Sequence, residues 1–135
     1  MRVVADSNAL VFYLFEPGRL TEPALEALAE AEDTEGISAS VASIGDLCYV
    51  TQKRGGAGIV PGTYEAIRQI LADPSLNFHA EPIIHATMEH FDRIPHKQLP
   101  DRFDRFIVAT AVQLHLPLVT ADRAIKATGG VEVIW

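Results

Sequence analysis

Met1-Arg2-Val3-Val4-Ala5-Asp6-Ser7-Asn8 opens the chain, and this stretch decides the fold. Residues 3–5 carry no charge and do not alternate with polar residues, which is typical of a strand buried on both faces of a parallel sheet. The three polar residues that follow are turn and cap formers, so the strand ends there. Ligands of open α/β sheets bind beyond the carboxyl ends of the strands, so Asp6 stands where a site is expected. An equally good alternative is that Asp6 only caps the next helix.

Strand-like and helix-like segments alternate along the rest of the chain. Strands are expected at residues 3–5, 36–38, 76–79, 117–120 and 131–134. Helices are expected at residues 9–15, from Thr21 onward, at 40–53, 61–73 and 83–91, from Asp101 onward, and at 121–126. This alternation predicts a three-layer α/β/α fold with a mainly parallel five-stranded sheet, formed by one domain over residues 1–135. Residues 53–58, rich in glycine, are interpreted as a plain connector.

The composition is that of a globular domain. The chain has 135 residues, of which 48% are hydrophobic and 21% charged, and no apolar run approaches the length of a membrane span. Cys48 is the one cysteine and sits in an apolar segment, which favours a small core residue and a reducing compartment. The Asp6 carboxylate stands where an export signal would need its apolar region, so no export signal is expected. A cytoplasmic protein without membrane contact is therefore expected.

The net charge of −7 argues against broad, nonspecific binding to nucleic acid. Acidic residues without any Lys or Arg among them crowd residues 22–35, and much of the negative charge lies there. Residues 93–126 hold more Lys and Arg than acidic residues. Two interpretations of this second region stay open, a mildly basic rim around a site and an ordinary mixed-charge surface.

Four carboxylates are not fully explained as surface residues. They are Asp6, Asp46, Asp104 and Asp122. Asp46 lies in a helix interior among apolar neighbours, where Asp is unfavourable and needs compensation. Asp101 and Asp104 have the spacing of a capping pair, and Asp122 could cap the helix after it. Each residue alone therefore has a structural explanation.

Their joint placement favours a site. Asp6 and Asp122 close two strands that can be neighbours across the switch point of the sheet, and the other two acids lie near the starts of helices at the same edge. Like charges this close repel one another unless a cation lies between them. Ligand sets made only of oxygen favour Mg²⁺ or Mn²⁺, and water on such a metal can attack phosphorus.

Four motifs in this order resemble those of the PIN-domain ribonucleases, and among them the VapC toxins of type II toxin–antitoxin modules. The motifs are Asp6-Ser7-Asn8, Ser43-Ile44-Gly45-Asp46, Asp101-Arg102-Phe103-Asp104-Arg105 and Leu118-Val119-Thr120-Ala121-Asp122. The resemblance implies a PIN-like α/β/α fold and a Mg²⁺- or Mn²⁺-dependent endoribonuclease acting on RNA. It also implies a homodimer inhibited by a VapB-type antitoxin whose C-terminal segment lies over the site.

The resemblance also implies roles for individual residues. Asp6, Asp46, Asp104 and Asp122 match the four catalytic, metal-binding acids, and Ser7, Asn8 and Thr120 match the small polar residues that support them. Ser7 and Asn8 are expected to support the Asp6 carboxylate. Asp6 and Asp104 are expected to contact the metal directly. The chain departs from the family pattern at Asp46, which is usually Glu, and at Arg102, which is usually Pro.

Three further interpretations remain at the level of sequence. Arg102 and Arg105 are candidates for phosphate contact, with solvated helix charge as the alternative. A catalytically silent PIN scaffold that binds a partner is favoured only by the short Asp46. A receiver-like signalling domain would need a lysine near the position of Thr120 and a second acid after Asp6, and this chain has neither.

Overall fold

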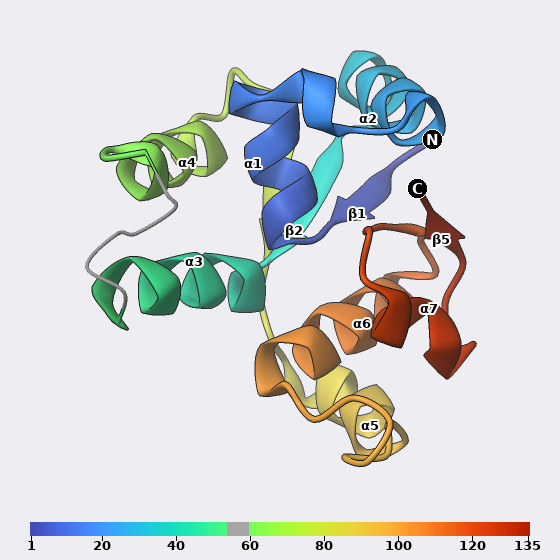
Figure 1. Cartoon of the computed structure of the whole chain (residues 1–135). Helices are drawn as coiled ribbons and strands as arrows, with labels where there is room; N and C mark the ends of the chain where they lie inside the picture. The colour runs from blue at the N-terminus through green and yellow to red at the C-terminus, as the bar shows by residue number, and fades with distance from the viewer. Residues whose placement is uncertain (54–59) are drawn as a thin grey trace.

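The computed structural model describes residues 1–53 and 60–135. Residues 54–58 of the expected connector lie outside the described residues. The centre of the fold is a five-stranded sheet (Figure 1). The strands are β1 (Val3–Ala5), β2 (Ile37–Ser40), β3 (Phe78–Glu81), β4 (Leu118–Val119) and β5 (Val133–Ile134). They lie in the order β3-β2-β1-β4-β5, and every pairing is parallel. The predicted parallel sheet is confirmed.

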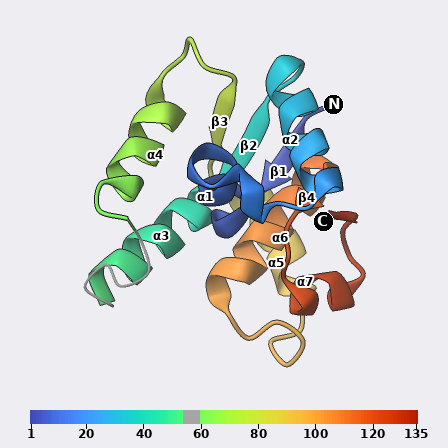
Figure 2. The ribbon, with the colours of Figure 1, turned by 45° about the horizontal axis from the view of Figure 1, so that its top comes forward.

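Helices cover both faces of the sheet. They are α1 (Ser7–Phe15), the 3₁₀ helix η1 (Pro17–Arg19), α2 (Glu22–Asp33), α3 (Val41–Lys53), α4 (Thr63–Ala72), α5 (His85–Asp92), α6 (Arg102–Leu114) and α7 (Arg123–Thr128). Apolar residues of α1, α2 and α4 pack on one face, and those of α6 and α7 pack on the other (Figure 2). The helix α3 contributes Leu47 to the first cluster and Ala42 to the second. The three-layer α/β/α architecture is therefore confirmed.

The first strand behaves as its composition predicts. Val3 and Ala5 pack into the cluster on one face of the sheet, Val4 packs into the cluster on the other, and all three are fully buried. A strand buried on both faces has no place for alternating polar residues, which explains why residues 3–5 lack them.

Several element boundaries differ from the expected ones. The third strand begins at Phe78, two residues later than expected, because residues 73–76 form a turn in which Leu76 N–H donates to Asp73 C=O at 3.2 Å. The helix expected from residue 61 begins only at Thr63, because Gly62 has a φ of +88° that ends the preceding turn. The last strand is also shorter than expected and begins at Val133. Each correction is local and leaves the order of the elements unchanged.

The point at which the chain changes direction across the sheet lies between β1 and β4. The chain builds outward from β1 to β2 and β3, and then returns to place β4 on the other side of β1. Val4 pairs with Leu118 and Ala5 with Val119, and the Asp6 N–H donates to the Val119 carbonyl at 3.2 Å. The prediction that the strands before Asp6 and Asp122 are neighbours is therefore confirmed.

Within residues 1–53 and 60–135, no helix is both long enough and apolar enough to cross a bilayer.

Candidate active site

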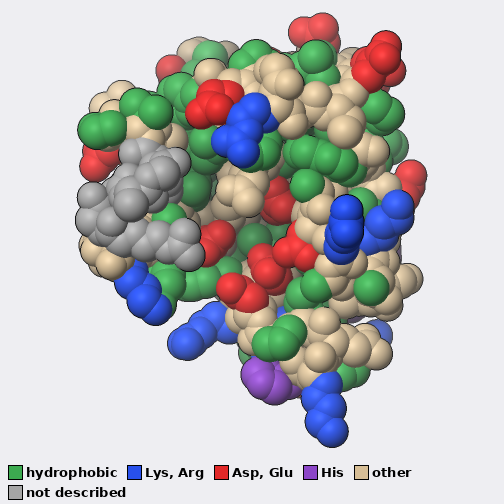
Figure 3. Space-filling model, viewed as in Figure 1, with side chains coloured by type: hydrophobic (Ala, Val, Ile, Leu, Met, Phe, Trp, Pro, Cys, Tyr) green, Lys and Arg blue, Asp and Glu red, His purple; other side chains and the backbone are tan. Residues whose placement is uncertain are grey.

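All four predicted carboxylates line one cavity at the carboxyl edge of the sheet. The cavity has a volume of about 320 Å³ and is lined by Asp6, Ser7, Asn8, Phe12, Asp46, Asp104, Ala121 and Asp122. These residues come from the β1–α1 junction and α1, from α3, from the first turn of α6 and from the β4–α7 junction. Figure 3 shows carboxylates gathered in the hollow at the centre of this face, with Lys and Arg side chains at several points around it. We call this hollow the acid cavity.

Asp6 both caps a helix and faces the acid cavity. Its Oδ1 accepts a hydrogen bond from the Ala9 N–H at 2.8 Å, which satisfies the start of α1, and its Oδ2 accepts one from the Thr120 hydroxyl. Burial raises the pKa of Asp6 to about 6, even though both hydrogen bonds act to lower it. The two interpretations of Asp6 left open by the sequence are therefore compatible.

Asp46 receives the compensation that its position in a helix requires. The Ser7 hydroxyl donates to Asp46 Oδ2 at 2.8 Å, across from α1 to α3. Burial raises the pKa of Asp46, and the charge of Asp101 adds to the rise. Ser7 was expected to support Asp6, and the structure corrects this, since its hydroxyl serves Asp46. Asn8 is exposed at the cavity wall, and its side chain makes no hydrogen bond to another described residue.

The two acids at the start of α6 have different roles. Asp101 is the N-cap, and its Oδ1 accepts hydrogen bonds from the N–H groups of Phe103 at 2.8 Å and Asp104 at 3.2 Å. The Asp104 carboxylate has no hydrogen-bond donor among the described residues. Its pKa is raised to about 7, first by burial and then by the charges of Asp101, Asp122, Asp46 and Asp6. Asp104 is thus the acid with the least local stabilisation.

Like Asp6, Asp122 both caps a helix and lines the acid cavity. Its Oδ1 accepts hydrogen bonds from the N–H groups of Ala124 at 2.8 Å and Ile125 at 3.2 Å, so it caps α7 as the alternative interpretation expected. Its own N–H donates to the Thr120 hydroxyl at 3.1 Å. Thr120 therefore connects the two strand ends, because the same hydroxyl donates to Asp6.

The donor chemistry of the acid cavity fits a hard divalent cation. Every ionisable ligand is a carboxylate, and the pKa of Asp104 shows that the four charges act on one another. As these side chains stand, however, the described part of the chain contains no group of three His, Cys, Asp or Glu residues that could hold a metal ion. Binding of a cation would therefore require the carboxylates to move.

The predicted arginines lie outside the acid cavity. Arg102 is exposed and lines a neighbouring cavity of about 510 Å³, which it shares with Tyr49, Lys53 and Asp46. Arg105 turns toward α5, where its Cζ lies 4.1 Å from the centre of the Phe91 ring. The sequence interpretation missed Tyr49 and Lys53. Their spacing of three and seven residues after Asp46 on a helix could have revealed them.

Comparisons with known proteins agree with this fold. A model of the PIN domain matches residues 3–131, whereas comparison with curated protein sequences gave no match. Among solved structures, the chain is similar to VapBC2 from Rickettsia felis bound to a promoter DNA fragment, with 12% identity and a TM-score of 0.71 over 98% of this chain and 97% of that one. It is similar to DNA-bound VapBC from Salmonella typhimurium, with 15% identity and a TM-score of 0.67 over 98% and 96%. It is also similar to FitAcB from Neisseria gonorrhoeae, with 19% identity and a TM-score of 0.62 over 98% and 96%.

These structural likenesses, all below 20% identity, show a shared fold that extends over almost the whole chain. The family model covers all four acidic motifs and both strand ends that form the acid cavity. The chain therefore belongs to the PIN domain family.

Proposed function

We propose that this protein is a Mg²⁺- or Mn²⁺-dependent endoribonuclease that acts as the toxin of a toxin–antitoxin pair. The observation that carries the proposal is the acid cavity, in which four carboxylates from four different elements face one another. Burial first, and then the charges of the neighbouring acids, raise the pKa of Asp104, so its ionised form is unfavourable in the metal-free fold. A resident cation would relieve this repulsion.

The proposal gives each acid a role. Asp6 and Asp104 would contact the metal, and Asp46 and Asp122 would complete the shell or orient water. The bound metal would supply charge stabilisation for the phosphate and an activated water for hydrolysis. Thr120 and the Ala9 N–H hold Asp6 in one orientation, and Ser7 does the same for Asp46. Asp46 is one methylene shorter than the usual Glu, so it would reach the metal through water.

The partner assignment is supported by the structures that share this fold. VapBC-5 from Mycobacterium tuberculosis is named as a member of the VapBC family of toxin–antitoxin systems, and a toxin–antitoxin complex from Klebsiella pneumoniae shares the fold as well. We infer a VapB-type antitoxin as the partner of this chain, a homodimer as its assembly, RNA as its substrate and the cytoplasm as its location.

One assay tests the enzymatic proposal. The purified chain, free of antitoxin, is incubated with total RNA and Mg²⁺ or Mn²⁺, next to the Asp6→Asn variant and to Glu26→Gln as a surface control. We expect cleavage by the parent and by Glu26→Gln, none by Asp6→Asn, and none after addition of EDTA. Asn can still cap α1, so Asp6→Asn tests the charge and not the fold. Equal cleavage by the parent and Asp6→Asn would disprove the mechanism.

A catalytically silent PIN scaffold is the second candidate. The observation that favours it is the lack of three potential ligands close enough to hold a metal within the described residues. The side chain of Asp46, shorter than the usual Glu, also favours the silent scaffold. This candidate predicts no cleavage under any condition in the assay above. It also predicts that Mn²⁺ leaves the thermal unfolding of the chain unchanged. The receiver-like alternative is set aside, because the PIN model matches residues 3–131.

A further inference from the structure

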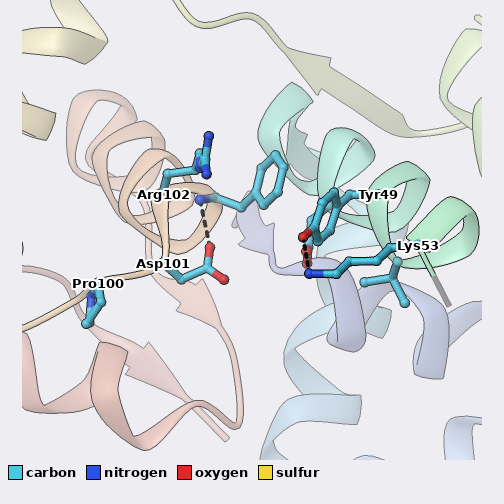
Figure 4. A pocket seen from close by; sticks show the side chains of 8 residues that line it. Tyr49, Lys53, Pro100, Asp101 and Arg102 are labelled. Carbon is cyan, nitrogen blue, oxygen red and sulfur yellow. Dashed lines mark hydrogen bonds between the residues drawn. The ribbon is translucent and has the colours of Figure 1, made fainter.

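The larger cavity beside the acid cavity lies between α3 and the start of α6 (Figure 4). Its volume is about 510 Å³, and Asp46 lines both cavities. Tyr49 and Lys53 come from α3, while Pro100, Asp101 and Arg102 come from the opposite wall. A chain that passes through the acid cavity can therefore continue into this space, which we call the α3–α6 cavity.

Tyr49 presents an aromatic ring in the α3–α6 cavity that the fold does not bury. The residue is 47% exposed, although its side chain is held on two sides. Lys53 Nζ donates to Tyr49 Oη at 2.7 Å, and the Phe103 ring lies 6.0 Å away between centroids at an angle of 48°. A large aromatic side chain that is positioned but solvent-exposed is suited to stacking against a flat ligand.

The charges around Tyr49 suit a strand of nucleic acid. Lys53 and Arg102 are exposed on opposite walls, and neither forms an ion pair with any described carboxylate. Two unpaired cations beside an acidic site can attract phosphates that the acids alone would repel. The Asp101 and Asp46 carboxylates in the same cavity can accept hydrogen bonds from the N–H groups of a base.

We propose that the α3–α6 cavity binds an unpaired ribonucleotide next to the phosphate that is cleaved, with its base stacked on Tyr49 and its phosphates near Lys53 and Arg102. This inference rests on the proposed ribonuclease function and adds a requirement to it. A base can reach Tyr49 only when it is not stacked in a duplex, so the substrate must be single-stranded at this position. An acidic peptide segment is the less favoured occupant, because it has no base to stack on the exposed Tyr49 ring.

The test measures RNA binding separately from cleavage. A fluorescent single-stranded oligoribonucleotide is titrated with the full chain carrying Asp104→Asn, in Mg²⁺, and fluorescence anisotropy gives the dissociation constant. Adding Tyr49→Ala should weaken binding about tenfold, as expected for the loss of one stacked base. Tyr49→Phe keeps the ring and should stay within about twofold of the parent.

The chain offers a matched control in α4. Tyr64 accepts a hydrogen bond from Arg68 Nη1 at 3.1 Å, so it repeats the Tyr49–Lys53 arrangement at the same spacing but outside both cavities. Tyr64→Ala should leave the dissociation constant unchanged. A fully paired RNA duplex should bind the parent and Tyr49→Ala equally. The slope of log K for RNA binding against log salt concentration should become shallower by about one unit in Lys53→Gln. Lys126→Gln should leave this slope unchanged.

The outcomes separate this inference from the proposed function. If the parent enzyme cleaves RNA but Tyr49→Ala binds RNA as tightly as Tyr64→Ala does, the inference is wrong and the function stands. If Tyr49→Ala instead weakens only the complex with the antitoxin, the cavity binds protein and the inference is also wrong. If Tyr49→Ala weakens RNA binding in a chain that never cleaves RNA, the nucleotide site stands and the catalytic proposal fails. If the chain neither binds nor cleaves RNA, both are wrong.

Discussion

The Thr120 hydroxyl has a single proton, and its surroundings determine where that proton points. Because the hydroxyl oxygen accepts the Asp122 N–H, its proton is directed to Asp6 Oδ2. Asp6 is only 8% exposed, so this hydrogen bond replaces water that the carboxylate has lost. One threonine thus keeps a buried carboxylate ionisable near neutral pH.

We expect Thr120→Val to destabilise the protein by about 2 kcal/mol at pH 8, because a buried charge loses its donor. The pKa of Asp6 should rise above its value of about 6, so the loss should shrink at pH 5, where the carboxyl is protonated. Urea unfolding at the two pH values measures this. Thr120→Ser retains the hydroxyl and should behave like the parent. Equal losses of stability for Thr120→Val at pH 5 and pH 8 would show that the substitution acts through packing and not through the charge of Asp6.

Asp104 stands at the opposite extreme, with no donor for its charge among the described residues. Its pKa of about 7 means that the folded state resists ionisation of this carboxyl. Asp104→Asn should therefore stabilise the metal-free protein by roughly 1 kcal/mol at pH 8, a value reduced for partial exposure to solvent. It should also abolish RNA cleavage. Urea unfolding in EDTA measures the gain, and Glu26→Gln, on an exposed surface, should show none.

At the scale of an element, the start of α6 combines a cap with a source of repulsion. Asp101 accepts two backbone N–H groups and also raises the pKa of Asp104. The sequence predicted this helix and its cap from the residue types alone. It also assigned Asp104, and not Asp101, to the site. It did not predict that Asp101 would act on the pKa of Asp104, because this depends on how the two carboxylates are buried in the fold.

Replacement of Asp101 can separate these two effects. Asp101→Ser keeps a capping oxygen without the charge, so the free energy of unfolding should stay within about 0.5 kcal/mol of the parent. Asp101→Ala should cost about 1 kcal/mol, because it removes the cap. Both variants should lower the pKa of Asp104 below about 7, which carboxyl NMR titration measures. An unchanged Asp104 pKa in both variants would show that the charge of Asp101 does not contribute to the shift.

The approach of α3 to α6 depends on a residue without a side chain. A Cβ placed on Gly45 would lie 3.3 Å from Phe103 Cε1, closer than most real contacts, so glycine allows Phe103 to pack here. Sequence patterns predicted both helices well. They could not predict this crossing or the α3–α6 cavity beside it, because a periodic pattern shows which face of a helix is buried but not which other helix packs against it.

At the scale of the whole molecule, the acid cavity makes stability depend on pH. The pKa values of Asp6, Asp46 and Asp104 are all raised, so the folded state binds more protons than the unfolded state between about pH 4 and pH 7. The metal-free protein should lose stability as the pH rises through this range. Thermal unfolding in EDTA at pH 5 and pH 8 measures this.

A divalent cation should oppose this loss. At pH 8, Mn²⁺ or Mg²⁺ should raise the melting temperature, because binding to the folded state alone adds stability by mass action. Salt of matched ionic strength with a monovalent cation controls for general screening. The same increase for parent and Asp104→Asn would place the cation elsewhere on the molecule.

The fold as a whole could be predicted because its elements are short and sharply bounded. The uncharged residues 3–5 predicted a buried strand. The capping residues Thr21 and Asp101 each predicted the start of a helix. The site was harder to predict. That the acids face one cavity follows from the sheet order, but Ser7 was matched with the wrong carboxylate because its partner lies 39 residues away on another helix.

Asp6 and Asp122 follow strands that are hydrogen-bonded to each other, whereas Asp46 and Asp104 are carried by helices that meet through side chains. Substitutions in α3 and α6 can therefore shift two of the carboxylates while the other two stay in place. The fold thus places one pair of carboxylates through the hydrogen bonds of the sheet and the other pair through the packing of two helices.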